Sequence, residues 1–565
     1  MRLSKSTGVL AASLVAVALV SSACSSSKGS GTTAAPISAT QEQINAQPRS
    51  ALQQGGTLKL AMADWSTNWQ LASENGNVSE DTLTVMSAVL PSPFHFEADA
   101  TPYYDPDYLT GEPVASTVGG KQTITYELNS KAVWSDGTPI TAADWIANWK
   151  ALNGTNTAFA PDATTGYNQI SSVKAGKSAY EVVVTFATPF ADWKSLFSDL
   201  YPASELSTPT EFNNALTSKL GVSGGPFEQG TISQTDQTVS LVPNPKWWGD
   251  APLLSSINFS TVTDNAQPQA FANGELSSVD LGPSPTGLKT AKATKNSSIL
   301  TAGGPEFRAL TENGSSAILS NVDVRQAVAE ALNRSAIAES DLAGMNVPET
   351  LVNNHFFMPN QKGYVNTSGA VGTYSPSSAE KLLDDAGWTL ASGATYRTKD
   401  GKTLSLNLLI PADTAVATNE ATLITDMLKA VGIKVTTTQD GNSFFTDIIA
   451  GKFDITIFSW IGTDFPFSSN FSLYQSEAAQ GGSWGQNYAH VGSSAIDKAL
   501  TTAVGASSQD EEIAQANAID KQLWQEAGVI PFYQRPEIEA QVKNLANYGA
   551  FGFADTIWQN IGFTK

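Results

Sequence analysis

The chain has 565 residues, of which 41% are hydrophobic and 9% aromatic, so it is long enough to build several packed cores. It carries 53 acidic against 32 basic side chains, and the formal net charge of −21 excludes the electrostatic attraction on which nucleic-acid-binding proteins rely. A single cysteine, Cys24, excludes an internal disulfide framework.

The first 23 residues have the features of an export signal. Arg2 and Lys5 precede an apolar stretch at residues 9–20 that is too short to span a bilayer. The sequence SSAC, which ends at Cys24, resembles a bacterial lipobox, in which lipid is joined to the cysteine and cleavage leaves it as the first mature residue. We therefore expect residues 1–23 to be a lipoprotein signal peptide, and lipid on Cys24 to hold the protein at the cell membrane, facing outside the cytoplasm.

Residues 24–53 are rich in serine, threonine, alanine and glutamine and have no apolar period. A segment of this composition cannot bury enough apolar surface to offset the entropy lost on ordering. We predict that these residues form a lipidated, disordered tether.

A strand, a turn and a helix then follow one another. Apolar and polar residues alternate at 124–129, the period of a half-buried strand, and WSDGTP at 134–139 supplies turn residues. Thr141, with Asp144 three residues later, precedes an apolar helical pattern and predicts a capping box. We expect the turn residues to be structural, with Trp134 packed beneath the turn.

The second half of the chain alternates strands with helices. A helix is predicted between Ser375 as N-cap and Gly387, which is suited to end it in the left-handed conformation. Strands and helices then alternate, with strands at 404–408, 433–437 and 453–460 and helices at 420–431 and 443–450. This series predicts a mostly parallel sheet whose ligands bind just beyond the carboxyl ends of the strands. A further capped helix from Ser508 and a strand at 529–533 follow.

Signals for common catalytic and cofactor sites are missing. The three histidines, His95, His355 and His490, are far apart and none has a second metal ligand at a suitable spacing. GKS at 176–178 and GKT at 401–403 lack the first glycine of a phosphate-binding loop, and no G-x-S-x-G elbow is present. We therefore predict no catalytic residues, no metal site and no cofactor, although a glycosidase-type pair among 53 carboxylates stays open.

Several motifs together resemble the family 5 extracellular solute-binding proteins of ABC importers, which include the oligopeptide- and dipeptide-binding proteins. The resemblance covers about residues 55–565, and its most specific part is YELNSKAVWSDGTPITAADWIANWKAL at 126–152. The other motifs, in order, are GGPF at 224–227, NPKWWG at 244–249, ANGELSSVDL at 272–281, VRQAVAEALNR at 324–334, AEKLLDDAGW at 379–388, GKFDITIFSW at 451–460, QNYAHVGSSAID at 486–497 and IPFYQ at 530–534.

The resemblance implies an α/β, two-lobed fold like that of class II periplasmic binding proteins, the venus-flytrap fold, with an extra domain inserted in the first lobe. It divides the chain into lobe 1 (54–92, 222–305 and 531–565), the inserted domain (93–221) and lobe 2 (306–530). It also implies a monomeric, non-enzymatic receptor that captures peptides by lobe closure and delivers them to an ABC permease with its ATPase subunits.

The same resemblance indicates a binding residue in FDITIFSWIGTDFP, residues 453–466. Peptide-binding members place an aspartate after a tryptophan here to pair with the N-terminal ammonium of the ligand, and Asp464 after Trp460 is the candidate, with one residue more between the two than the usual spacing. A carboxylate removed from water is costly unless it is paired, which an incoming ammonium provides. An exposed or internally paired Asp464 is the alternative.

Four further residues near this strand end are candidates for the ligand site. Trp460, Phe465 and Tyr488 are suited to form aromatic walls or simply to pack in the core, and Asn487 to bond a ligand backbone. Other solutes stay open, since the family includes receptors for nickel complexes and oligosaccharides and 13 tryptophans suit sugar stacking. An exported carbohydrate hydrolase is the remote alternative, and it would need a functional carboxylate pair.

Overall fold

The computed structural model describes residues 42–76, 79–412, 414–441 and 443–565. The predicted signal peptide, Cys24 and the first part of the predicted tether lie outside the described residues. Residues 42–53 do not continue a disordered tether: β1 (Leu52–Gln53) pairs with β21 (Gly562–Thr564), and Asn45 donates through Nδ2 to the carbonyl of Leu545 at 2.6 Å. Hydrogen bonds to the C-terminal segment hold these residues in place. The sequence gives no sign of these bonds, because they do not depend on an apolar pattern.

One sheet joins the beginning of the described chain to its middle. It has the order β2 (Thr57–Met62), β11 (Ser256–Thr261), β10 (Thr238–Pro243) and β9 (Phe227–Ser233). β2 and β11 are parallel and the other pairs antiparallel. Leu58, Leu60 and Met62 point into one apolar core because alternate side chains of a strand share a face. The helices from this part of the chain are α1 (Glu80–Ser87), α4 (Gln267–Ala272) and α5 (Pro285–Ala293).

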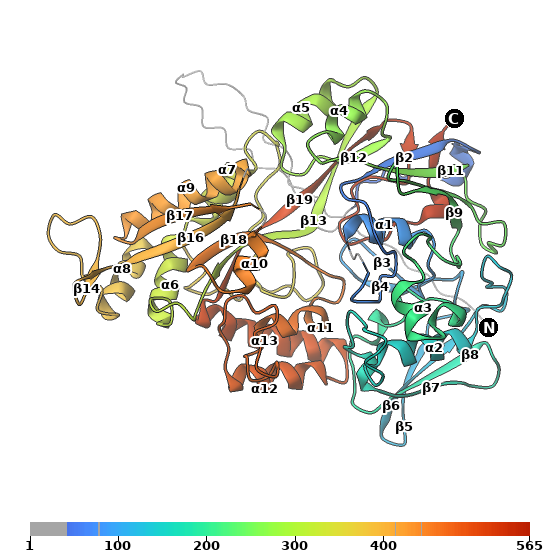
Figure 1. Cartoon of the computed structure of the whole chain (residues 1–565), viewed down its shortest axis with the longest axis horizontal. Coiled ribbons are helices and arrows are strands. Elements are labelled where there is room, and N and C mark those ends of the chain that lie inside the picture. The colour runs from blue at the N-terminus through green and yellow to red at the C-terminus, as the bar shows by residue number, and fades with distance from the viewer. Residues whose placement is uncertain (1–41, 77–78, 413, 442) are drawn as a thin grey trace, which may run out of the picture. The chain divides into compact units, whose positions relative to one another are not determined.

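The chain between β2 and β9 builds a second, antiparallel sheet of β5 (Val114–Val118), β6 (Lys121–Glu127), β8 (Glu181–Phe186) and β7 (Ile170–Ala175), shown in Figure 1. α2 (Ala142–Leu152) begins with the predicted capping box, in which Asp144 Oδ2 accepts from the N–H of Thr141 at 2.8 Å. Trp134 is buried, as expected. This stretch also contributes α3 (Pro209–Asn214) and the hairpin of β3 (Phe94–Phe96) and β4 (Pro102–Tyr104).

The largest sheet has six strands in the order β12, β19, β13, β18, β16 and β17. Their bounds are Ser278–Asp280, Val529–Val542, Ser297–Glu312, Ile455–Ile461, Ser405–Pro411 and Lys434–Asp440. The β-α-β-α-β prediction is confirmed, since β16, β17 and β18 are parallel and are connected through α9 (Ala415–Ala430) and α10 (Phe444–Ile449). The prediction of a mostly parallel sheet is wrong, because β13, β19 and β12 join it with antiparallel pairing. The antiparallel strands come from parts of the chain distant from β16, β17 and β18. The local alternation of strands and helices therefore does not predict that they join the sheet.

Glycines end the helices around this sheet as the sequence predicts. Gly387, Gly432 and Gly451 have φ of +86°, +88° and +65°, just after α8 (Pro376–Asp385), α9 and α10. Ser375 occupies the predicted N-cap position, but its side chain makes no capping hydrogen bond. The other helices here are α6 (Val322–Ala331), α7 (Arg334–Asp341), α11 (Pro466–Asn470), α12 (Ser494–Val504) and α13 (Gln509–Glu526). No helix within the described ranges is long and apolar enough to cross a bilayer.

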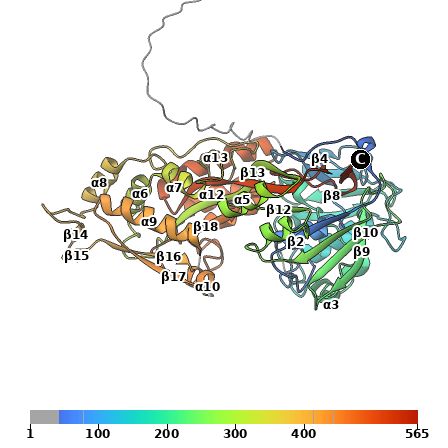
Figure 2. The same ribbon diagram turned by 90° about the horizontal axis from the view of Figure 1, so that it is seen from above.

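β13 and β19 are the longest strands and lie side by side in both views (Figures 1 and 2). The lobe boundaries expected at residues 305/306 and 530/531 fall within these two strands, so each strand runs through both predicted lobes. Their pairing is interrupted between Gly303 and Phe307, where residues 304–306 lie opposite Arg535 alone. Extra residues of this kind form a bulge, which bends a strand.

Candidate functional site

A cavity of about 200 Å³ lies beyond the carboxyl end of β18. Its walls come from residues 99–102, from Asp192 and Lys194, from the segment containing Phe357, Gln361 and Lys362, from residues 464–467, and from the first turns of α13. Ligand pockets commonly measure about 300–1,000 Å³, so this cavity suits one end of a larger ligand. The position agrees with the expectation that ligands bind beyond the strand ends.

Asp464 is one of the cavity-lining residues, between the end of β18 and the start of α11. Its side chain is half-buried, and apart from its own N–H no described residue hydrogen-bonds or ion-pairs with its carboxylate. Burial and the negative charge of Asp555 raise the pKa of Asp464 from its ordinary 3.8 to about 8. A ligand cation at this point would restore the ionised form.

Two further carboxyl groups, Asp192 and Glu512, lie against each other in the cavity wall, and each residue is only 2% exposed. We call them the carboxyl pair. Burial raises the pKa of both, and the charge of Asp192 helps to raise the pKa of Glu512 to about 10. The two groups therefore hold a proton at neutral pH, because neighbouring buried carboxylates do not both ionise readily.

The two lysines at the cavity do not neutralise these acids. The ammonium of Lys194 lies 2.6 Å from the carboxylate of Glu112, outside the cavity wall. Lys362 is exposed and forms no ion pair with any residue that the structure describes. The cavity therefore favours a positively charged ligand group.

Phe465 is the second predicted site residue at this cavity. It lines the cavity, is 5% exposed, and packs edge-on against Phe96 with ring centroids 5.6 Å apart. Phe357 and Phe467 contribute further buried aromatic surface. Acidic and apolar groups therefore line the same small cavity.

Trp460 and Tyr488 stack on each other, with centroids 5.7 Å apart and planes 20° from parallel, but neither lines the cavity. Asn487 is buried, and its Nδ2 donates to the carbonyls of Gln475 and Val491, both at 2.8 Å. In this conformation the side-chain amide of Asn487 stabilises the loop around it through these two hydrogen bonds. The structure thus brings Asp464 and Phe465 together and places the other three candidates elsewhere, so ligand contact stays a prediction for all five.

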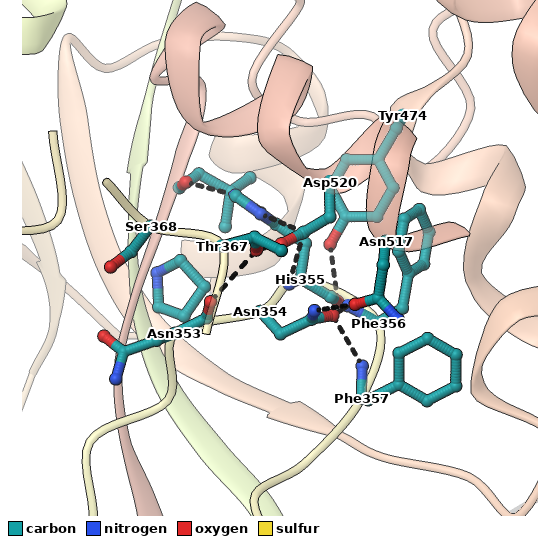
Figure 3. Close-up of polar contacts among 12 residues, drawn as sticks. Asn353, Asn354, His355, Phe356, Phe357, Thr367, Ser368, Tyr474, Asn517 and Asp520 are labelled. Carbon is teal, nitrogen blue, oxygen red and sulfur yellow. Dashed lines mark hydrogen bonds and ion pairs between the residues drawn. The ribbon is translucent and has the colours of Figure 1, made fainter. Parts of the chain in front are cut away.

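A polar cluster surrounds His355, close in sequence to the cavity-lining residue Phe357 (Figure 3). His355 Nδ1 is 2.7 Å from Asp520 Oδ1, and its Nε2 is 2.8 Å from the carbonyl oxygen of Val529. The hydroxyl of Thr367 donates to the other oxygen of Asp520. A nucleophilic triad needs the hydroxyl on the imidazole, whereas here both ring nitrogens are engaged elsewhere, so the cluster is built to hold structure.

The polar cluster fixes the segment that carries Phe357. Asn354 Oδ1 accepts from the N–H groups of Phe356 and Phe357, both at 3.0 Å, while its Nδ2 donates to Asn517 Oδ1 on α13 at 2.8 Å. Further along, Gln361 Nε2 donates to the carbonyl of Thr463 at 2.7 Å. The cavity walls are therefore joined by hydrogen bonds next to Asp464.

Asp192, Glu512 and Gln361 were missed by the sequence analysis. Glu512 had a usable signal: with Ala516, Ile519 and Leu523 it follows the spacing of the buried stripe of α13, an unusual place for a carboxylate. Asp192 lies in an irregular segment remote in sequence from α13, so no local pattern predicts their meeting. No group of three or more metal-ligating side chains is found among the described residues.

Comparison with known proteins identifies the class of protein to which this fold and site belong. Residues 112–482 match the bacterial extracellular solute-binding proteins, family 5, and the chain belongs to this family. The oligopeptide-binding protein OppA of Mycobacterium tuberculosis is 34% identical over 561 residues, covering 97% of this chain and 92% of that protein. The two-lobed binding-protein fold and the resemblance noted from the motifs are thereby confirmed.

Solved structures agree on the fold. The periplasmic EDTA-binding protein EppA superposes with a TM-score of 0.82 at 24% identity, covering 94% of this chain and 99% of that chain. The oligopeptide-binding protein AppA from Bacillus subtilis, solved in complex with a nonapeptide, superposes with a TM-score of 0.72 at 18% identity, covering 91% of this chain and 100% of that chain. Both superpositions show that this chain shares the fold of these two binding proteins.

Proposed function

We propose that this protein captures peptides with a free N-terminus outside the cytoplasm and delivers them to an ABC importer. The observation that carries the proposal is the Asp464 carboxyl group, which lines the cavity without a cation partner among the described residues. A peptide ammonium entering the cavity supplies the missing positive charge, and buried charge-assisted hydrogen bonds are among the strong ones. The main chain of the ligand then extends beyond a cavity that holds only its first residue.

The similarity to OppA across nearly the whole chain supports peptides over the other solutes in this family. In the proposal, ligand contacts on both lobes favour the closed state, and no bond in the ligand is broken. The proposal includes the division into two lobes and an inserted domain, with boundaries at residues 92/93, 221/222, 305/306 and 530/531. It also includes a monomeric state and a lipid anchor on Cys24. The proposed partners are a permease and its ATPase subunits.

The test is calorimetry with peptides that co-purify with the mature protein lacking Cys24, identified by native mass spectrometry. We expect Asp464→Asn to weaken binding of free-amine peptides about 10- to 100-fold, because a hydrogen-bonded charge pair is lost. The N-acetylated forms of the same peptides should bind the two proteins equally.

Glu477→Gln is the matched control, since it removes an exposed carboxylate of the same lobe that does not line the cavity. Unchanged affinity of Asp464→Asn for free-amine peptides would exclude Asp464 as the ammonium group. A single co-purifying mass that is not a peptide would exclude peptide capture and favour a nickel complex or an oligosaccharide.

A further inference from the structure

The carboxyl pair is a second acidic feature of the cavity, separate from Asp464. Asp192 comes from the segment after β8, and Glu512 from the first turns of α13. Both are 2% exposed, and Glu512 Oε1 accepts no hydrogen bond from any donor that the structure describes. Ser468 and Gln509 lie within reach of Asp192, but neither brings a positive charge.

Within the described part of the chain, no lysine, arginine or histidine forms an ion pair with the carboxyl pair. The charged groups that line the same cavity are Asp99, Asp464, Lys194 and Lys362. Lys194 is paired with Glu112 and Lys362 is exposed at the surface. A ligand with a single ammonium group can form an ion pair with Asp464. The carboxyl pair then still has no cation and keeps its shared proton.

Apolar side chains line the same cavity as the two acidic features. Phe357, Phe465 and Phe467 are 3%, 5% and 1% exposed and line the cavity, and Ile513 follows Glu512 directly. A chain with cations at its ends and methylenes between them fits this combination of acidic and apolar groups, because lysine and arginine bury their stems along apolar surface while the charged head meets polar groups. A bare metal ion would make no use of the apolar wall.

We propose that the carboxyl pair of Asp192 and Glu512 is a second cation subsite, and that the protein prefers peptides whose first residue is lysine or arginine. The inference rests on the proposed function, because it assumes that the peptide ammonium lies at Asp464. The basic side chain of that same first residue then extends along the phenylalanines to the pair. There its positive charge replaces the shared proton, which passes to solvent. The pair with its bound cation therefore carries the same net charge as the pair with its proton, and the released proton balances the charge that the ligand brings.

The experiment compares two synthetic tripeptides that differ in one charge, Lys-Ala-Ala and norleucine-Ala-Ala, by calorimetry on the full mature chain. We expect the lysine peptide to bind at least about tenfold more tightly, since a buried charge-assisted contact is worth more than a neutral one. Titration in two buffers of different ionisation heat should show that the lysine peptide releases more protons than the norleucine peptide. That measurement needs no variant.

Glu512→Gln and Asp192→Asn, which keep the shape of each side chain, should each reduce the preference for lysine to within about twofold while norleucine-Ala-Ala still binds. Asp510→Asn is the matched control, because Asp510 is exposed in the same turn of α13 and does not line the cavity. It should keep the full preference.

The outcomes separate the two proposals. Equal affinity and equal proton release for the two tripeptides in the unaltered protein would overturn the second subsite and leave peptide capture standing. If neither tripeptide binds and the diamine cadaverine does, peptide capture fails and the two-cation cavity stands as a diamine site. If none of the three binds, both proposals fail.

Discussion

At the scale of single residues, Asp464 combines a cost in folding with a proposed role in binding. Its pKa is about 8 in the folded protein against an ordinary 3.8, so the folded state holds the proton more tightly than the unfolded chain does. Ionisation therefore opposes folding: the loss of stability is absent below about pH 4 and grows as the pH rises towards 8. An unpaired carboxyl that lowers stability is typical of a site organised for a ligand.

We predict that Asp464→Asn stabilises the ligand-free protein in the alkaline part of this range. An asparagine cannot ionise, so the melting temperature should rise by about 1–3 °C near pH 8, a modest amount because the side chain is only half-buried and solvent screens it. Near pH 4 the two proteins should melt together. Differential scanning fluorimetry across the pH range gives the comparison, and a lower melting temperature at pH 8 would contradict a half-buried, unpaired Asp464.

At the scale of elements, α13 carries two carboxylates on its buried stripe, and they have different roles. Glu512 faces the cavity, whereas Asp520 is fully buried and accepts from the backbone N–H of His355 at 2.7 Å, from its ring and from Thr367. Asp520 thus ties the segment containing residues 353–362 to α13. α13 therefore forms part of one cavity wall through Glu512 and, through Asp520, positions the segment that forms another.

We predict that Asp520→Ala destabilises the protein by about 3–5 kcal/mol, because it leaves buried donors and an imidazole without their acceptor. Urea unfolding followed by circular dichroism measures the change. Peptide affinity should fall as well, since Phe357 and Gln361 lie on the segment that is released. Asp510→Ala, at an exposed position of α13, should change the unfolding midpoint little.

Local elements were predictable from the sequence where the signal lies within a few residues. The capping box at Thr141, the left-handed glycines after α8, α9 and α10, and the placing of Asp464 beyond β18 each depend on neighbours in the chain. The antiparallel strands β13 and β19 and the carboxyl pair depend on segments hundreds of residues apart. Tertiary pairing alone decides these features, so local patterns in the sequence do not reveal them.

At the scale of the whole molecule, β13 and β19 are the continuous connections through both predicted lobes. Their bulge at residues 304–306 interrupts the ladder close to the expected boundary at 305/306. Hinges of two-lobed binding proteins need a few positions that absorb a change in backbone angles. Gly304 lies at this bulge, and its backbone approaches β19 closely: a Cβ added there would lie 2.8 Å from the carbonyl oxygen of Arg535.

The last prediction concerns this hinge. Gly304→Ala forces β13 and β19 apart at the bulge, which should cost about 1–3 kcal/mol of stability and change the balance between open and closed states. Small-angle X-ray scattering with and without a saturating peptide measures closure as a decrease in the radius of gyration. We expect a smaller decrease in Gly304→Ala than in the unaltered protein.

Gly505→Ala is the control for this experiment, because a Cβ there would meet nothing closer than 3.6 Å and the residue lies far from the bulge in sequence. It should close normally. If Gly304→Ala also closes normally and binds peptide with unchanged affinity, the bend is located elsewhere along β13 and β19. If the unaltered protein binds peptide without any decrease in the radius of gyration, capture does not use lobe closure, and Asp464 and the carboxyl pair must act in a preformed cavity.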